Sequence, residues 1–212
     1  AYSVNGQGIT AYVMDSGIRD THQEFQGRAS LGYDFVYGEE DANPGIGLGE
    51  DCNGHGTAVA SIIGGDKFGA AKGVKLVSLK TFTCEGRFSL SRMLAAVEWV
   101  TVNAVKPAMV NGSFGYLESE SIDIAFKNSI LSGIHYSVSA GNDQSDACTK
   151  SPARVAEAIT VGASDINNNM AYFSNYGSCV DIFGPGLNVT AASNVDNFSS
   201  RLFNGTSAAA PY

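Results

Sequence analysis

Apolar residues gather in short runs that alternate with longer segments of helical periodicity. Residues 8–15 (GITAYVMD) form a run rich in strand-forming residues that ends abruptly in Asp-Ser-Gly, and residues 74–82 (VKLVSLKTF) form a similar run. From Ser89 onward, apolar residues recur at intervals of three and four until Lys106-Pro107, where a proline would end a helix. These patterns predict two buried strands followed by a helix.

The next part of the chain repeats the same order. Strand patterns cover residues 108–115 and 134–142 on either side of a helical pattern at 120–133, and further strand patterns cover 158–164 and 179–186. Strands that alternate with helices of about ten or more residues predict an α/β fold of three layers, in which helices cover both faces of a mainly parallel sheet.

Ligands in such folds bind beyond the carboxyl ends of the strands. Asp15, Ser113 and Asn142 each follow closely after a predicted strand or end it. We therefore expect these three side chains to lie along one rim of the sheet.

Length and composition indicate a single domain that spans residues 1–212, of which 44% are apolar. The formal net charge of −8 disfavours nucleic acid and anionic membranes as main partners, because both would repel the protein on average. No apolar run approaches the roughly 18 to 20 residues that cross a bilayer. The acidic, glycine-rich stretch at residues 38–51 is expected to be a surface loop.

Four cysteines occur without the Cys-x-x-Cys spacing of zinc sites. They are Cys52, Cys84, Cys148 and Cys179. Either they pair in one of three ways, in an oxidising compartment, or they remain buried thiols. Composition alone does not decide between these alternatives.

Three local signatures place chemically useful side chains next to glycines and small residues. VMDSG ends a strand at Asp15, DCNGHGT places His55 at the start of a helix rich in small residues, and FNGTSAAAP places Ser207 at the start of another. A serine hydroxyl becomes a nucleophile when an imidazole can take its proton, and a buried carboxylate can orient that imidazole. Backbone N–H groups at a helix start, together with the Asn142 amide, could bind a developing oxyanion.

Each signature has a common structural explanation. An Asp before Ser-Gly usually forms a turn, a histidine between glycines is usually structural, and Gly-Thr-Ser usually caps a helix. Their occurrence together, in the order Asp15, His55 and Ser207 on an alternating strand-helix pattern, is much more specific.

The chain resembles the subtilisin-like serine peptidases over essentially its whole length, specifically the proteinase K branch close to the aqualysin-type bacterial members. The resemblance rests on DSGI, HQEFQGR, DCNGHGT, SAGN, SPARVAEAITVGAS, FSNYGSCVDIFGPG and NGTS. It implies that Asp15 orients and supports the imidazole, His55 is the general base and then acid, Ser207 is the nucleophile, and Asn142 is the oxyanion donor. The implied function is a secreted serine endopeptidase that acts through an acyl-enzyme.

The resemblance also implies structural features and partners. Cys52 would pair with Cys84 and Cys148 with Cys179, and a structural calcium ion would bind Asp181 and carbonyls near Ala156 and Ala158. Catalysis would need no cofactor. The expected partners are a protein or peptide substrate and a pro-segment of the precursor, and the expected state is a monomer.

Family members bind substrate as an extended strand between two enzyme segments. The matching segments here are Gly86-Arg87-Phe88 and Ser113-Phe114-Gly115, and Ser139-Ala140-Gly141 would wall the first pocket. Arg87, Phe88 and Tyr116 place bulk where the family usually has smaller residues, which predicts narrowed outer pockets. The alternative is a solvated arginine beside a core aromatic ring.

Three positions depart from the family pattern beside the triad. Ala58 and Ala208 remove packing volume, and Tyr212 replaces a histidine. These changes keep open a second hypothesis, a pseudopeptidase that retains the cleft as a binding or regulatory module, and a third, a noncatalytic domain whose helix caps imitate a triad. The resemblance also predicts that these residues belong to a longer chain, with a segment before residue 1 and a nucleophile helix that continues past Pro211.

Overall fold

The computed structural model describes residues 4–36 and 49–212. Most of the surface loop expected at residues 38–51 lies outside the described residues. The centre of the structure is a seven-stranded sheet in the order β2-β3-β1-β4-β6-β8-β9. Each pairing between its neighbouring strands is parallel, which confirms the predicted α/β fold class.

The strands of this sheet follow the apolar runs closely. Six of them are β1 (Thr10–Asp15), β3 (Lys75–Lys80), β4 (Ala108–Gly112), β6 (His135–Ser139), β8 (Ile159–Ser164) and β9 (Ile182–Pro185), all within predicted segments. The seventh, β2 (Ala29–Asp34), is an edge strand that the sequence patterns did not predict. The β1 strand is buried along its whole length, because it lies at the middle of the sheet and has helices on both faces.

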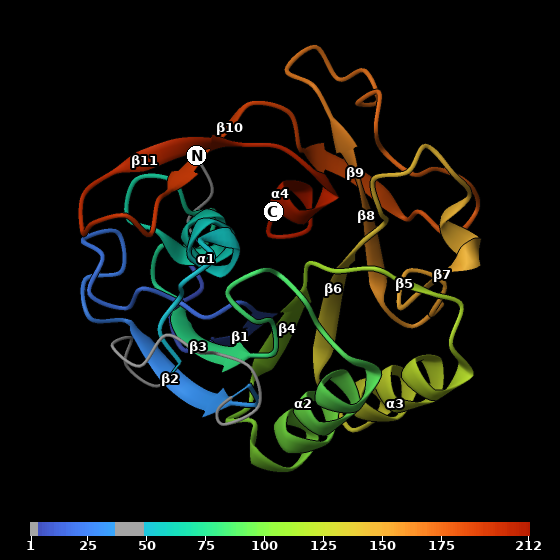
Figure 1. The fold of residues 1–212 in the computed structure, drawn as a ribbon, viewed down its shortest axis with the longest axis horizontal. Helices are drawn as coiled ribbons and strands as arrows, with labels where there is room; N and C mark the ends of the chain where they lie inside the picture. Colours follow the sequence, from blue (N-terminus) through green and yellow to red (C-terminus); the bar gives the residue numbers. More distant parts are fainter. Residues whose placement is uncertain (1–3, 37–48) are drawn as a thin grey trace.

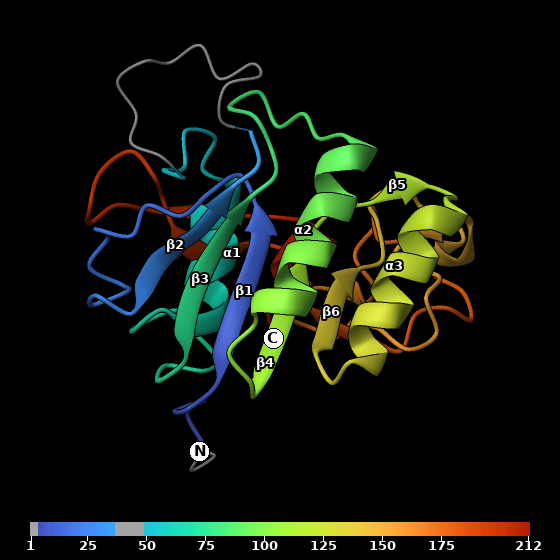
Figure 2. The same ribbon diagram turned by 90° about the horizontal axis from the view of Figure 1, so that it is seen from below.

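Helices cover both faces of the sheet. Figures 1 and 2 show α2 (Leu90–Asn103) and α3 (Glu120–Leu131) on one face, and α1 (His55–Gly64) with the short α4 (Thr206–Ala209) on the other. Apolar clusters fill both interfaces, one around Met93, Phe126 and Tyr136 and one around α1. None of the helices in the described ranges combines the length and the hydropathy of a membrane span.

Smaller elements lie around the rim. An antiparallel hairpin joins β10 (Val189–Ala192) to β11 (Ser200–Phe203), and a two-residue ladder joins β5 (Tyr116–Leu117) to β7 (Lys150–Ser151), which follows the 3₁₀ turn Ala147–Thr149. These elements bring residues far apart in the sequence to the carboxyl end of the main sheet.

Both cysteine pairings implied by the family resemblance are present. Cys52 is bonded to Cys84 and Cys148 to Cys179, and no free cysteine remains. The first bond joins the segment before α1 to the segment after β3. A second contact supports this connection, because Asn53 Nδ2 donates to the Cys84 carbonyl at 2.8 Å.

Candidate active site

The first two signature residues meet at the carboxyl end of the sheet. Asp15 is the last residue of β1 and is fully buried, and His55 is the first residue of α1. His55 Nδ1 lies 2.7 Å from Asp15 Oδ1 and 2.9 Å from Oδ2. This contact fixes the orientation of the ring and leaves Nε2 on its opposite side, available to a second group.

The glycine after His55 permits this close approach. A Cβ atom at Gly56 would lie 2.1 Å from the Gly17 carbonyl oxygen and 3.1 Å from the Asp15 Cβ atom. Any side chain there would push α1 away from the end of β1. The second glycine of DCNGHGT is therefore required at this position because no side chain fits between α1 and the end of β1.

The surrounding charges raise the pKa of His55 above its ordinary value of 6.5. Burial opposes this shift, because it disfavours the charged ring, but the charge and hydrogen bond of Asp15 outweigh it. Asp51 adds a smaller raising effect and Arg201 a smaller lowering one. The imidazole is thus held beside a carboxylate that favours its cationic form.

Ser207 lies in α4 and is 7% exposed. It lines the same cleft as His55. Its hydroxyl donates to the Ser113 carbonyl at 3.3 Å. To act as a nucleophile, the hydroxyl would have to exchange this partner for the imidazole, and catalytic hydrogen bonds are often completed only when substrate binds.

The Asn142 side chain is oriented by Thr206. Its Oδ1 atom accepts from Thr206 N at 2.8 Å and from Thr206 Oγ1 at 3.0 Å, so the Nδ2 donor faces the other way. A Cβ atom at Gly205, which has φ +136°, would lie 3.6 Å from both Asn142 Nδ2 and Ser207 N. The missing side chain leaves space between two N–H donors, as a developing oxyanion would require.

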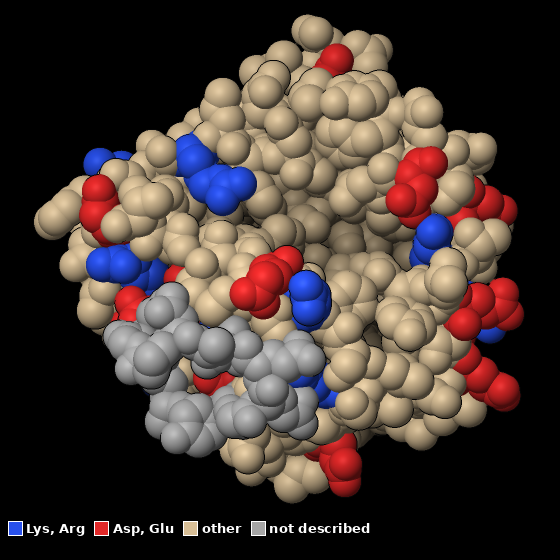
Figure 3. Space-filling view, in the orientation of Figure 1, with Lys and Arg blue, Asp and Glu red and all other residues tan. Residues whose placement is uncertain are grey.

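A cleft of about 640 Å³ contains these groups. The space-filling view shows this face hollowed near its centre (Figure 3). Most of the residues expected to bind substrate line the cleft; these are Gly86, Phe88, Ser113, Phe114, Gly115, Ser139 and Gly141. Of the other two, Arg87 is exposed outside the lining and Ala140 is fully buried behind it.

Aromatic rings occupy one end of the cleft. Phe88 packs against Phe82 at 5.2 Å and against Phe114 and Tyr116 at 6.0 Å, measured between ring centroids. The contact between Phe88 and Tyr116 joins the two segments expected to flank a substrate. Arg87 is exposed, whereas Phe88 and Tyr116 meet within the cleft lining, and the narrowing of the outer pockets stays a prediction.

The two alanines that depart from the family pattern lie on the same helices as His55 and Ser207. Ala58 on α1 and Ala208 on α4 are both fully buried and belong to the same apolar cluster. The two helices thus pack through small side chains.

Sequence reasoning missed several residues that shape the site. Asp51 is buried, and its carboxylate accepts from Ser16 Oγ and from the backbone N–H groups of residues 53, 54 and 57. Phe203 places its ring edge-on to His55 at 5.2 Å. The position of Asp51 just before CNGHG was a sequence signal that could have identified it as a site residue. The position of Phe203 beside His55 instead depends on how the hairpin of β10 and β11 folds.

The predicted calcium ligands lie away from the cleft. Asp181 is exposed, and its Oδ2 atom accepts from Thr160 N at 2.8 Å, which holds the carboxylate beside the strand that follows Ala156 and Ala158. One carboxylate with nearby carbonyls suits a hard cation. Within the described residues there is no group of three or more acidic, histidine or cysteine side chains that could hold a metal.

Sequence comparisons identify the family to which the chain belongs. A family model described as the subtilase family matches residues 6–212. The chain is 46% identical over its full length to the extracellular serine proteinase of Thermus sp. (strain Rt41A), and 43% identical to the alkaline serine exoprotease A of Vibrio alginolyticus. It covers 50% and 38% of those proteins, so it spans half or less of the length of these curated relatives.

A solved structure of a subtilisin-like proteinase has the same fold as this chain. The crystal structure of a cold adapted subtilisin-like serine proteinase superposes with a TM-score of 0.92 at 41% identity. The match covers the whole of this chain and 74% of the other.

The pKa of His55 provides a direct test of the pair with Asp15. In Asp15→Asn, the pKa should fall from its raised value, because burial then acts without the main opposing charge. Nuclear magnetic resonance titration of the His55 ring protons measures it. Asp165→Asn, which removes a carboxylate that is not among the causes of the shift, is the control. An unchanged His55 pKa in Asp15→Asn would contradict the interpretation.

Proposed function

Because the chain belongs to the subtilase family, we propose that it is a serine endopeptidase that hydrolyses extended polypeptides through an acyl-enzyme. The observation that carries the proposal is the contact between buried Asp15 and His55 beside a cleft that Ser207 also lines. An imidazole held by a carboxylate beside a serine is the arrangement that activates a hydroxyl.

In the proposed reaction, His55 Nε2 takes the proton from Ser207 Oγ as that oxygen attacks the substrate carbonyl carbon. The carbon–nitrogen bond then breaks, and His55 returns the proton to the leaving amine. A water molecule releases the acyl group by the same steps, with His55 again the base. Since the base must be neutral, activity should decline as the pH falls through the raised pKa of His55.

The oxyanion of each tetrahedral intermediate would lie between Asn142 Nδ2 and Ser207 N, beside Gly205. Thr206 supports this role, because its two hydrogen bonds to Asn142 Oδ1 hold the amide in one orientation before substrate arrives. Preorganised donors of this kind stabilise a charge that appears only during the reaction.

We also propose that the substrate backbone lies between residues 86–88 and 113–115 as an added strand. The contact between Phe88 and Tyr116 favours small residues where the substrate passes the outer end of the cleft. Secretion is supported by the two disulfides, which persist in oxidising compartments. A pro-segment and a monomeric state remain predictions.

Two observations favour the alternative, a pseudopeptidase that binds peptides without cleaving them. The Ser207 hydroxyl donates to the Ser113 carbonyl, and the small residues Ala58 and Ala208 pack beside the catalytic helices. If the hydroxyl kept this partner when peptide is bound, the cleft would bind without turnover.

Labelling by a fluorophosphonate separates the two functions. We expect covalent modification of Ser207 in the unchanged protein and none in Ser207→Ala, because the reagent reacts with a serine activated by a base. Intact-mass and peptide mass spectrometry locate the label, and Ser178→Ala, which removes an exposed serine elsewhere, is the control. Peptide binding without any labelling would support the pseudopeptidase and reject the peptidase.

Substitution of the oxyanion donor tests the role of Asn142. Asn142→Leu should lower kcat by about 10²–10³-fold with little change in KM, because the amide would act mainly on the transition state; this is the size of the effect in subtilisin. Steady-state kinetics on a chromogenic peptide measure both constants. A change confined to KM would assign Asn142 to substrate binding instead.

We further infer that a structural calcium ion binds Asp181 together with carbonyls near Ala156 and Ala158. The inference is supported by the hydrogen bond from Thr160 N, which fixes one carboxylate oxygen beside that segment. A bound ion would supply stability and no step of the reaction.

Thermal unfolding with and without calcium tests this site. Calcium should stabilise the unchanged protein by about 2 to 3 kcal/mol at a hundred times its Kd, and should have little effect on Asp181→Asn. Asp66→Asn, which removes another exposed carboxylate, should respond like the unchanged protein. An equal calcium response in Asp181→Asn would place the ion elsewhere.

A further inference from the structure

A buried lysine contacts one sulfur of the first disulfide. Lys80 is the last residue of β3 and is 3% exposed. Its Nζ atom donates to the Glu50 carbonyl at 3.0 Å and to Cys52 Sγ at 3.4 Å. An ammonium group is therefore held beside the bond that joins Cys52, before α1, to Cys84, next to a wall of the cleft.

The two sulfurs of this bond lie in different electrostatic surroundings. Cys52 has the Lys80 ammonium group beside it, whereas Cys84 is followed by the exposed Glu85. The buried carboxylate of Asp51 precedes Cys52, but its oxygens already accept from a serine hydroxyl and from backbone N–H groups at the start of α1. A negative charge is thus stabilised more on the Cys52 sulfur than on the Cys84 sulfur.

The bond can be reached from solvent. Both Cys52 and Cys84 are half-buried, and residues 85–87, which follow Cys84, are exposed. A small molecule can therefore approach the Cys84 sulfur at the margin of the cleft, while Lys80 lies on the enclosed side of the bond.

The second disulfide lacks such a neighbour. Cys148 Sγ lies 3.5 Å from Ser178 Oγ, and within the described ranges neither sulfur of the Cys148–Cys179 bond has a lysine or arginine as a hydrogen-bond partner. Lys150 lies two residues away, but its Nζ atom pairs with Asp143 Oδ2 at 2.8 Å. The same chain therefore contains a reference disulfide without a cation at its sulfurs.

The first disulfide also connects a wall of the cleft to α1. Residues 83–87 form a turn closed on itself, because Thr83 N donates to the Arg87 carbonyl and Gly86 N donates to the Thr83 carbonyl. The disulfide and the hydrogen bond from Asn53 to the Cys84 carbonyl join this turn to the segment before His55. Loss of the covalent bond would weaken that connection.

We propose that the Cys52–Cys84 disulfide is a thiol-exchange site, at which a small thiol bonds to Cys84 and Cys52 leaves as a thiolate beside Lys80. Exchange would loosen the cleft wall at residues 86–88 and lower the affinity for peptides. The consequence for cleavage rests on the proposed peptidase function, whereas the exchange itself does not.

The atoms and electrons of the exchange balance with a thiol as the only co-reactant. A thiolate attacks Cys84 Sγ, a new sulfur–sulfur bond forms, and the Cys52–Cys84 bond breaks with its electron pair on Cys52 Sγ. A second thiol can then displace the first from Cys84. Two thiols are oxidised to one disulfide as the protein bond is reduced to two thiols, and a leaving thiolate beside a cation departs faster.

Mass spectrometry identifies the sulfur that is attacked. Ser207→Ala, which removes self-digestion, is treated with limiting 2-mercaptoethanol, free thiols are alkylated with iodoacetamide, and the peptides are mapped. We expect the mercaptoethanol adduct on Cys84 and the alkyl group on Cys52. An adduct mainly on Cys52, or equally on both, would overturn the proposal.

Substitution of Lys80 tests the cause. Lys80→Met should slow exchange at the first disulfide about tenfold relative to the Cys148–Cys179 bond in the same sample, because the leaving sulfur loses its stabilising charge. Lys80→Arg keeps the charge and should stay within about twofold of the unchanged protein. An unaltered relative rate in Lys80→Met would reject the role of Lys80.

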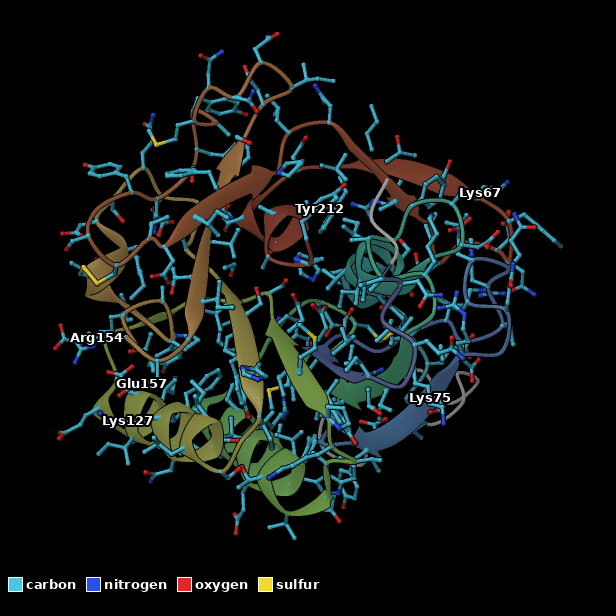
Figure 4. All side chains as sticks on the ribbon, turned by 180° about the vertical axis from the view of Figure 1, so that it is seen from behind. Lys67, Lys75, Lys127, Arg154, Glu157 and Tyr212 are labelled. Atoms are coloured by element: carbon cyan, nitrogen blue, oxygen red, sulfur yellow. A yellow bond between two sulfur atoms is a disulfide. The ribbon has the colours of Figure 1, made fainter. Side chains whose placement is uncertain are left out.

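A second lysine of the same strand provides the matched control. Lys75 begins β3, is exposed and is labelled in Figure 4. Lys75→Met makes the same substitution and should leave both exchange rates unchanged. If Lys80→Met does not fold, both of its disulfides exchange fast together, and the adduct position in folded Lys80→Arg decides: Cys84 supports the proposal and Cys52 overturns it.

Peptide affinity and cleavage test the effect on the cleft. Fluorescence anisotropy with Ser207→Ala should give a Kd about tenfold weaker after exchange, and kcat/KM of the unchanged protein should fall at the rate of exchange and recover on reoxidation. Exchange that alters neither constant would overturn the link to the cleft. A thiol-dependent Kd without fluorophosphonate labelling of Ser207 would support the exchange site while rejecting the peptidase function.

Discussion

The buried contact between Asp15 and His55 is the constraint on which the site depends. A carboxylate with no exposed surface is costly unless hydrogen bonds and a compatible neighbour compensate for lost water. The imidazole supplies two contacts and Ser16 N donates a third to Oδ1. Hydrogen bonds also compensate the buried carboxylate of Asp51, whose oxygens accept from the Ser16 hydroxyl and from backbone N–H groups. The proton affinity of His55 therefore depends on two acidic side chains, Asp15 and Asp51, that the fold keeps buried beside it.

The parallel sheet explains how such a contact forms between distant residues. The β1 strand ends at Asp15, and the β4 strand ends one residue before Ser113, at the same edge. The helices α1 and α4 pack beside that edge and each presents a reactive side chain in its first turn. The Cys52–Cys84 bond then ties the segment before His55 to the segment that begins at Gly86, so the start of α1 and a wall of the cleft are connected covalently.

The strength of the periodic signal decided which elements the sequence could predict. The β1 strand is buried on both faces and its sequence is one apolar run, whereas β2, at the sheet edge, is buried only at Ala29 and gives a weaker pattern. The hairpin of β10 and β11 depends on pairing across a loop, so the contact of Phe203 with His55 was not visible. The positions of Asp15, His55 and Ser207 were visible because glycines mark them, but the contact of the Ser207 hydroxyl with the Ser113 carbonyl depends on tertiary packing that no sequence pattern encodes.

The end of β6 and the segment that follows it contribute several neighbouring residues to the cleft. Within five residues they supply Ser139 and Gly141 to a pocket wall, Asn142 to the proposed oxyanion site and Asp143 to an ion pair with Lys150. Asn142 is held from one side by Thr206, and Asp143 from the other by Lys150 and Asn175. Hydrogen bonds from two different parts of the chain therefore fix the backbone segment that carries both a pocket wall and the proposed oxyanion donor.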